Sequence, residues 1–132
     1  MRVLVVEDNA ALAAVLRFNL ERLPAQVTWA NTGDRAIGML DRDVFDIIVT
    51  DYQLPGASGD EVIRAARRSE RNREVPIILL TAKERELDVE RIRDVHSVAA
   101  VVPKPFSPRQ VTELVRRLTE STGVVEQESR HA

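Results

Sequence analysis

The chain has 132 residues, 44% of them hydrophobic and 30% charged, which is enough for one globular domain with a buried core. Its formal net charge of −2 argues against a protein that binds nucleic acid through phosphates. Cysteine is absent, which excludes disulfides, thiolate metal ligands and a cysteine nucleophile. We find no signal-peptide layout and no apolar run near the roughly 18 residues of a membrane span. We therefore expect a cytoplasmic protein that binds neither membranes nor nucleic acid directly.

Short apolar runs alternate with longer stretches of helical period, and this alternation predicts a series of βαβ units. Near-continuous apolar runs are typical of parallel strands that are buried on both faces. The fold class is therefore predicted as α/β, with an open, doubly wound parallel sheet between two layers of helices. The predicted strands lie at about 2–6, 26–30, 47–50, 76–80 and 98–102. The predicted helices lie at about 10–23, after Thr32, and at about 60–69, 87–96 and 107–119.

The last predicted helix has the clearest pattern. Ser107 is a plausible N-cap and Pro108 suits the first turn. Apolar side chains follow at the spacing i, i+3, i+4 and i+7, namely Val111, Leu114, Val115 and Leu118. The pattern stops after Thr119. We therefore expect one domain over residues 1–119 and a flexible polar tail over residues 120–132.

Polar residues follow four of the predicted strands. Glu7 and Asp8 follow the first strand, Asp51 the third and Thr81 the fourth, while Lys104 comes just after the fifth. The carboxyl ends of parallel strands lie at one edge of a sheet, where ligands bind in open α/β folds. These five side chains are therefore expected to share one pocket.

Three carboxylates in one pocket repel one another unless a cation or a proton is taken up. Carboxylate oxygens and water suit Mg²⁺, which often bridges to phosphate groups. Lys104 can bind a phosphoryl group as a point charge, and the Thr81 hydroxyl can donate to a phosphoryl oxygen. A carboxylate such as Asp51 can itself be the nucleophile in phosphoryl transfer. The set predicts a magnesium and phosphoryl site.

Each of these residues also has an ordinary structural explanation. A single aspartate at a strand end is common as a turn or helix cap, a threonine there is usually a cap, and a lysine is usually a solvated surface charge. The joint pattern over four strand ends is much harder to explain in this way.

Four segments in this order resemble the receiver domain of bacterial two-component response regulators, in particular its single-domain chemotaxis-type form. The segments are VLVVEDN at 3–9, DIIVTDYQLPG at 46–56 with Gly59, LTA at 80–82 and KPF at 104–106. The resemblance covers about Arg2 to Leu118. It implies a flavodoxin-like (βα)5 fold with strand order 2-1-3-4-5.

The resemblance also implies the phosphotransfer roles. Asp51 would be the phosphoacceptor, taking its phosphoryl group from a sensor histidine kinase or a histidine phosphotransfer protein. Thr81 matches the switch hydroxyl and Lys104 the phosphate-binding lysine, and the Lys104–Pro105 bond is cis in similar proteins. Such a protein is a phosphoacceptor that assists its own phosphorylation and slow dephosphorylation, rather than an enzyme with a separate substrate. It signals through altered binding to a downstream protein.

The metal ligands are implied in the same way. Asp8 would bind Mg²⁺ directly and Glu7 through water, while Asp51 and the backbone carbonyl of Gln53 would complete the protein's contribution.

One position departs from the family pattern. Similar receivers carry Tyr or Phe three residues before the lysine, where this chain has Val101. The aromatic part of the switch is therefore missing, and the output is expected to differ on the face formed by helix 87–96, strand 98–102 and helix 107–119. The apolar edge strand there favours a partner or a homodimer, unless the flanking helices simply cover it.

Three alternatives remain. The chain could be a pseudo-receiver that binds constitutively, or the receiver half of a longer transcriptional regulator. A flavin-binding protein or a haloacid-dehalogenase-type phosphatase is disfavoured, because Glu7 and Asp8 would repel a flavin phosphate and because Gln53 stands where that phosphatase has an acid.

Trp29 and Tyr52 are expected to be packing residues.

Overall fold

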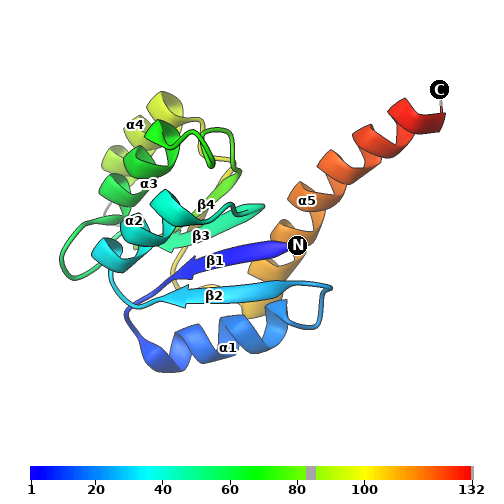
Figure 1. The fold of residues 1–132 in the computed structure, drawn as a ribbon. Helices are drawn as coiled ribbons and strands as arrows, with labels where there is room; N and C mark the ends of the chain where they lie inside the picture. The colour runs from blue at the N-terminus through cyan, green and yellow to red at the C-terminus, as the bar shows by residue number, and fades with distance from the viewer. Residues whose placement is uncertain (83–85, 132) are drawn as a thin grey trace.

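The computed structural model describes the backbone of residues 1–82 and 86–131 and the side chains of residues 1–82 and 88–120. Five strands and five helices alternate along the described part of the chain (Figure 1). The strands are β1 (Arg2–Val6), β2 (Gln26–Ala30), β3 (Ile47–Asp51), β4 (Ile77–Thr81) and β5 (Ala100–Pro103). The helices are α1 (Ala10–Leu20), α2 (Gly33–Arg42), α3 (Gly59–Arg68), α4 (Glu86–His96) and α5 (Pro108–His131).

The strands form one parallel sheet in the order β2-β1-β3-β4-β5, which confirms the expected fold. Helices α1 and α5 cover one face of this sheet and α2, α3 and α4 cover the other (Figure 1). Alternate side chains of each strand point to opposite faces, so the protein has two apolar cores. In β1, for example, Leu4 packs on the side of α2 and α3, while Val3 and Val5 pack on the side of α1 and α5.

Capping residues begin three of the helices shortly after the strands that precede them. The side chains of Asn9, Thr32 and Ser58 accept hydrogen bonds from backbone N–H groups in the first turns of α1, α2 and α3. At the start of α3 the backbone comes close to the end of β3: the N–H of Gly59 donates to the carbonyl of Tyr52 at 2.8 Å. A methyl group at Gly59 would overlap the carbonyl of Asp51, so this loop needs glycine.

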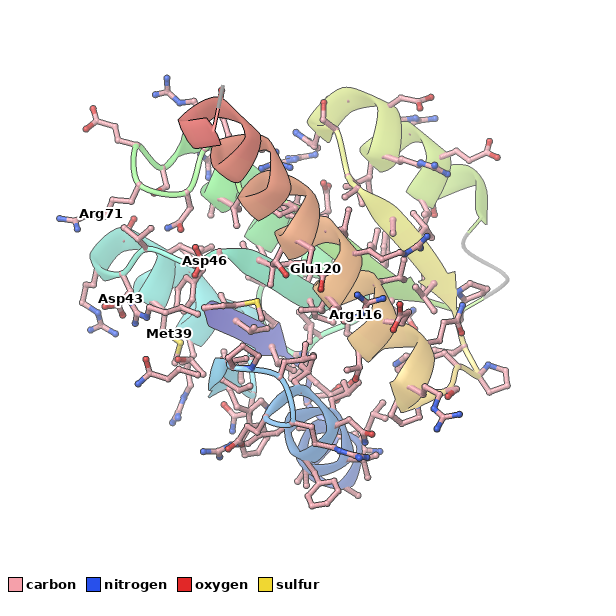
Figure 2. The ribbon with its side chains drawn as sticks, turned by 90° about the vertical axis from the view of Figure 1, so that its right-hand side faces the viewer. Met39, Asp43, Asp46, Arg71, Arg116 and Glu120 are labelled. Carbon is pink, nitrogen blue, oxygen red and sulfur yellow. The ribbon has the colours of Figure 1, made fainter. Side chains whose placement is uncertain are left out.

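The largest difference from expectation is at the C-terminal end. The polar tail, which was expected to be flexible from residue 120 onward, is helical as far as His131, where α5 ends, and it extends away from the sheet (Figure 1). The segment lacks an apolar stripe but contains no proline and several good helix formers, so backbone hydrogen bonding can continue. The domain boundary at residue 119 remains a prediction. Figure 2 shows Arg116 and Glu120 on α5, where Arg116 Nη1 lies 2.7 Å from Glu120 Oε2.

The boundaries of two other elements differ from the predicted ones. Helix α1 ends at Leu20 rather than near residue 23, because the chain turns before Pro24. Strand β5 begins at Ala100 rather than at Val98, because Ser97 takes a left-handed conformation (φ 54°) that ends α4. No helix among the described residues is both long enough and apolar enough to cross a membrane.

Candidate functional site

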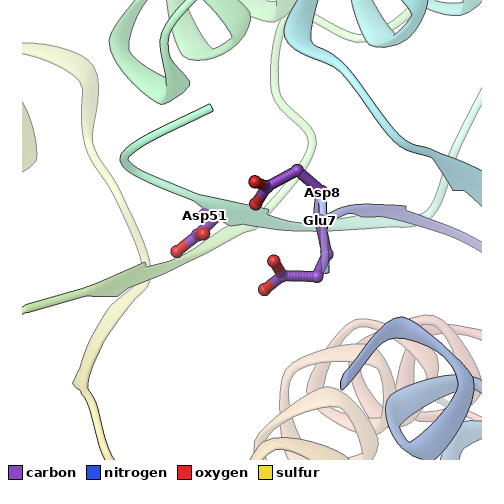
Figure 3. Close-up of side chains that lie close together, drawn as sticks. All are labelled: Glu7, Asp8 and Asp51. Carbon is purple, nitrogen blue, oxygen red and sulfur yellow. The ribbon is translucent and has the colours of Figure 1, made fainter. Parts of the chain in front are cut away.

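The three predicted carboxylates meet at the carboxyl ends of β1 and β3. Glu7 and Asp8 directly follow β1, and Asp51 is the last residue of β3 (Figure 3). One carboxylate oxygen from each residue lies within 4.8 Å of the others. Strands β1 and β3 are neighbours in register, with Val6 opposite Thr50, so the sheet itself brings these carboxylates together.

Lys104 reaches the same pocket from the end of β5. Its Nζ lies 2.8 Å from Asp51 Oδ1 and 3.8 Å from Glu7 Oε1. Its backbone N–H donates to the carbonyl of Thr81 at 2.7 Å, which ties the start of the β5–α5 loop to β4. The Lys104–Pro105 peptide bond is cis, as the resemblance implied.

The remaining two predicted residues lie at the ends of neighbouring segments. Thr81 is buried at the end of β4, and its hydroxyl donates to the carbonyl of Ala82 at 3.2 Å. Gln53 is exposed in the loop after β3. The roles of both residues toward a phosphoryl group or a metal stay predictions.

Glu7 is an unusual carboxylate because it is fully buried. Burial raises its pKa from 4.5 to about 7, and the negative charge of Asp51 adds to this rise. The backbone N–H of Asn9, which donates to Oε2 at 3.0 Å, and the ammonium of Lys104 act in the opposite direction. The other oxygen, Oε1, is buried without a hydrogen-bond partner among the described residues.

Asp51 is also short of compensating charge. Burial raises its pKa, the hydrogen bond and positive charge of Lys104 lower it, and the charge of Asp8 raises it further. Among the side chains that the structure describes, one lysine therefore faces three carboxylates. A divalent cation with a preference for oxygen ligands fits this donor set, and the unpartnered Glu7 Oε1 is a free acceptor for it or for its water.

The structure adds one residue that the sequence did not single out. Trp29 was expected only to pack, yet its side chain is 37% exposed and its indole N–H donates to the carbonyl of Glu7 at 2.7 Å. No motif marks this position. The pairing of β2 with β1 could have indicated it, because Trp29 lies opposite Val5, two residues before Glu7.

Val101, the departure from the family pattern, lies on β5 opposite Leu79 of β4. It is partly buried and packs against the core between the sheet and helices α2, α3 and α4.

The family model that describes the response regulator receiver domain matches residues 3–116. The chain therefore belongs to the response regulator receiver domain family, and the resemblance seen in its motifs is confirmed. It is 37% identical over 118 residues to the phosphate regulon transcriptional regulatory protein PhoB of Escherichia coli (strain K12), covering 89% of this chain and 49% of that protein. The PhoB of Rhizobium meliloti (strain 1021) is 36% identical, with 89% and 51% covered. The chain thus spans about half the length of the curated relatives it matches.

Solved structures agree with this assignment. The receiver domain of the sensor histidine kinase PA1611 from Pseudomonas aeruginosa PAO1, which holds a magnesium ion in its active site cleft, is 30% identical with a TM-score of 0.79. The match covers 90% of this chain and 97% of that one. The chemotaxis response regulator CheY4 of Vibrio cholerae has a TM-score of 0.80, covering 89% and 97%; at 23% identity it supports the fold alone.

Proposed function

We propose that this chain is a Mg²⁺-dependent phospho-receiver whose acceptor is Asp51. The observation that carries the proposal is the cluster of side chains: a buried Asp51 carboxylate with oxygens of Glu7 and Asp8 within 4.8 Å and Lys104 Nζ at 2.8 Å. The phosphoryl donor is the phosphohistidine of a sensor histidine kinase or a histidine phosphotransfer protein. Magnesium in the receiver domain of PA1611 supports the choice of metal.

In the transfer step, a carboxylate oxygen of Asp51 attacks phosphorus. An O–P bond forms as the N–P bond of the donor phosphohistidine breaks, and the imidazole leaves with its electron pair. Asp8, Asp51 and the backbone carbonyl of Gln53 would bind Mg²⁺ directly, and Glu7 would bind it through water. When bound there, Mg²⁺ would supply positive charge that offsets the negative charge on the transferring group.

Lys104 and Thr81 act on the phosphoryl group after transfer. The Lys104 ammonium, which pairs with Asp51 before phosphorylation, then pairs with a phosphoryl oxygen. The Thr81 hydroxyl turns from the carbonyl of Ala82 to donate to the same group. This turn alters the surface beside β4 and thereby binding to a downstream protein. A homodimer through α4, β5 and α5 is one form that this output would take.

A second candidate is a receiver that works within a longer transcriptional regulator. It is favoured by the PhoB relatives, which are transcriptional regulatory proteins and extend well beyond the matched part. The phosphotransfer chemistry is the same in both cases. A pseudo-receiver is less well supported, because the acceptor, the acidic pair and the lysine are all in place.

The test is incubation with a small acyl-phosphate donor, with and without Mg²⁺, followed by intact mass. We expect a mass gain of one phosphoryl group that needs Mg²⁺ and is lost in Asp51→Asn. Full phosphorylation of Asp51→Asn would overturn the acceptor assignment. Full phosphorylation of the unmodified chain in excess chelator would overturn the role of the metal.

A further inference from the structure

Trp29, the single tryptophan of the chain, contacts the proposed metal site from an edge strand. It lies on β2, which pairs only with β1 in the described sheet, and its indole N–H donates to the carbonyl of Glu7 at 2.7 Å. Trp29 lines a cleft of about 310 Å³ together with residues of α1, among them Ala10, Ala13 and Ala14. Because space remains around the ring, close packing does not explain a tryptophan at this position.

The indole hydrogen bond is one of three that hold Glu7 in place. The backbone N–H of Glu7 donates to the carbonyl of Ala30 at 3.1 Å, and its Oε2 accepts from the N–H of Asn9 at 3.0 Å. Strand β2 ends at Ala30, so the sheet ladder stops here and the indole of Trp29 supplies the next donor. Within the described residues, Oε1 is thereby the one hydrogen-bonding atom of Glu7 left without such a partner.

The carbonyl of Glu7 belongs to the peptide unit that joins Glu7 to Asp8. A peptide unit is planar, so a donor that holds this oxygen also fixes the direction in which the chain leaves toward Asp8. Asp8 is exposed and lies outside both the sheet and α1, so neither element fixes its backbone. Preorganised ligands bind a metal more tightly than ligands that must first be ordered.

We infer that Trp29 is a positioning residue for the metal site: its indole N–H holds the Glu7–Asp8 peptide so that both carboxylates face Asp51. The inference rests on the proposed function, because it concerns the same site. It assigns to β2, a strand that contributes no ligand, a part in setting the affinity for Mg²⁺.

The test compares Mg²⁺ binding to the full chain by isothermal titration calorimetry. Trp29→Phe keeps an aromatic ring but removes the donor. Replacement of Trp29 by 3-benzothienylalanine keeps the shape of the indole and exchanges its N–H for sulfur, which makes it the stricter variant if Trp29→Phe folds poorly. Phe18→Ala is the matched control, because Phe18 lines the same cleft and is 71% exposed.

We expect both Trp29 replacements to raise the Mg²⁺ dissociation constant by about 3- to 10-fold, the range that one lost hydrogen bond supports. Phe18→Ala should leave it unchanged. For the benzothienyl chain, urea unfolding in chelator checks that the domain still folds, and some loss of stability is expected because the carbonyl of Glu7 loses its donor. A purely structural role would lower stability in the same way but leave the Mg²⁺ dissociation constant unchanged. Unchanged affinity in both Trp29 replacements would overturn the inference. An unmodified chain that binds no Mg²⁺ would overturn the proposed metal site itself.

Discussion

At the scale of single residues, Glu7 carries the strongest conflict between stability and function. Its carboxyl is fully buried, one oxygen has no hydrogen-bond partner among the described residues, and its pKa is raised to about 7. A neutral side chain at this buried position would make the folded protein more stable. The cost is understandable if the charged form is the one that binds a cation.

The raised pKa of Glu7 predicts how stability depends on pH. Between about pH 4.5 and 7 the unfolded chain loses this proton before the folded chain does, so without metal the free energy of unfolding falls as pH rises. Glu7→Gln should reduce this slope to the part that comes from the raised pKa of Asp51, and should raise the free energy of unfolding by about 1–3 kcal/mol at pH 8 in chelator. It should also weaken Mg²⁺ binding. Urea unfolding in chelator at pH 5 and pH 8 measures the pH slope and the gain in stability, with the exposed Glu70→Gln as control. Lower stability of Glu7→Gln at pH 8 would contradict the account.

Lys104 is the single described cation that pairs with these carboxylates, and its removal should act in two directions. Lys104→Met deletes the ammonium 2.8 Å from Asp51 and leaves the pocket more negative, so Mg²⁺ should bind about 3- to 10-fold more tightly. The phosphorylated form should lose much of its effect on partner binding, with the fold intact. Calorimetry checks the affinity, with the exposed Arg109→Met as control. Weaker Mg²⁺ binding in Lys104→Met would show that the lysine does not compete with the cation.

At the scale of elements, the loop from β3 to α3 packs closely against Asp51, the proposed acceptor. The N–H of Gly59 donates to Tyr52, and a side chain at Gly59 would overlap the carbonyl of Asp51. Gly59→Ala should therefore destabilise the fold by about 1–3 kcal/mol and slow phosphorylation. Gly38→Ala offers the matched comparison, because a methyl group there meets nothing within 4 Å; it should stabilise α2 by about 0.5–1 kcal/mol. Equal effects of the two substitutions in urea unfolding would refute this reading of the loop.

Strand β5 carries Val101, the position that departs from the family pattern. Val101 is partly buried against the core, in register with Leu79. Val101→Tyr should therefore leave the rate of Mg²⁺-dependent phosphorylation within about twofold, while it changes the surface that α4, β5 and α5 offer to a partner. A time course of intact mass with the acyl-phosphate donor measures the rate. A large loss of rate would mean that β5 takes part in the transfer itself.

At the scale of the whole molecule, most of the fold followed from the sequence because one physical rule dominates it. Buried parallel strands are continuous apolar runs, and parallel order brings their carboxyl ends to one edge. The convergence of Glu7, Asp8 and Asp51 could therefore be predicted without coordinates. The strand order itself came from the family resemblance rather than from the pattern of residues.

Other features depend on information that a linear pattern does not carry. The helix beyond Thr119 lacks an apolar stripe, so hydrophobic periodicity could not predict it. The bond from Trp29 to Glu7 depends on the register between β2 and β1 and on a side-chain direction. The raised pKa of Glu7 depends on burial in three dimensions. The sequence therefore indicated which side chains meet at the site, whereas the contacts that hold them and the pKa of Glu7 required the structure.

The central claim is that Asp51 receives the phosphoryl group, and the most direct test locates that group. The chain is phosphorylated with an acyl-phosphate donor and Mg²⁺, reduced with borohydride, which converts an aspartyl phosphate to homoserine, and then mapped by peptide mass spectrometry. We expect homoserine at position 51 and at no other acidic position, and none when Mg²⁺ is chelated. Homoserine at Asp8 or elsewhere, with Asp51 unchanged, would contradict the account.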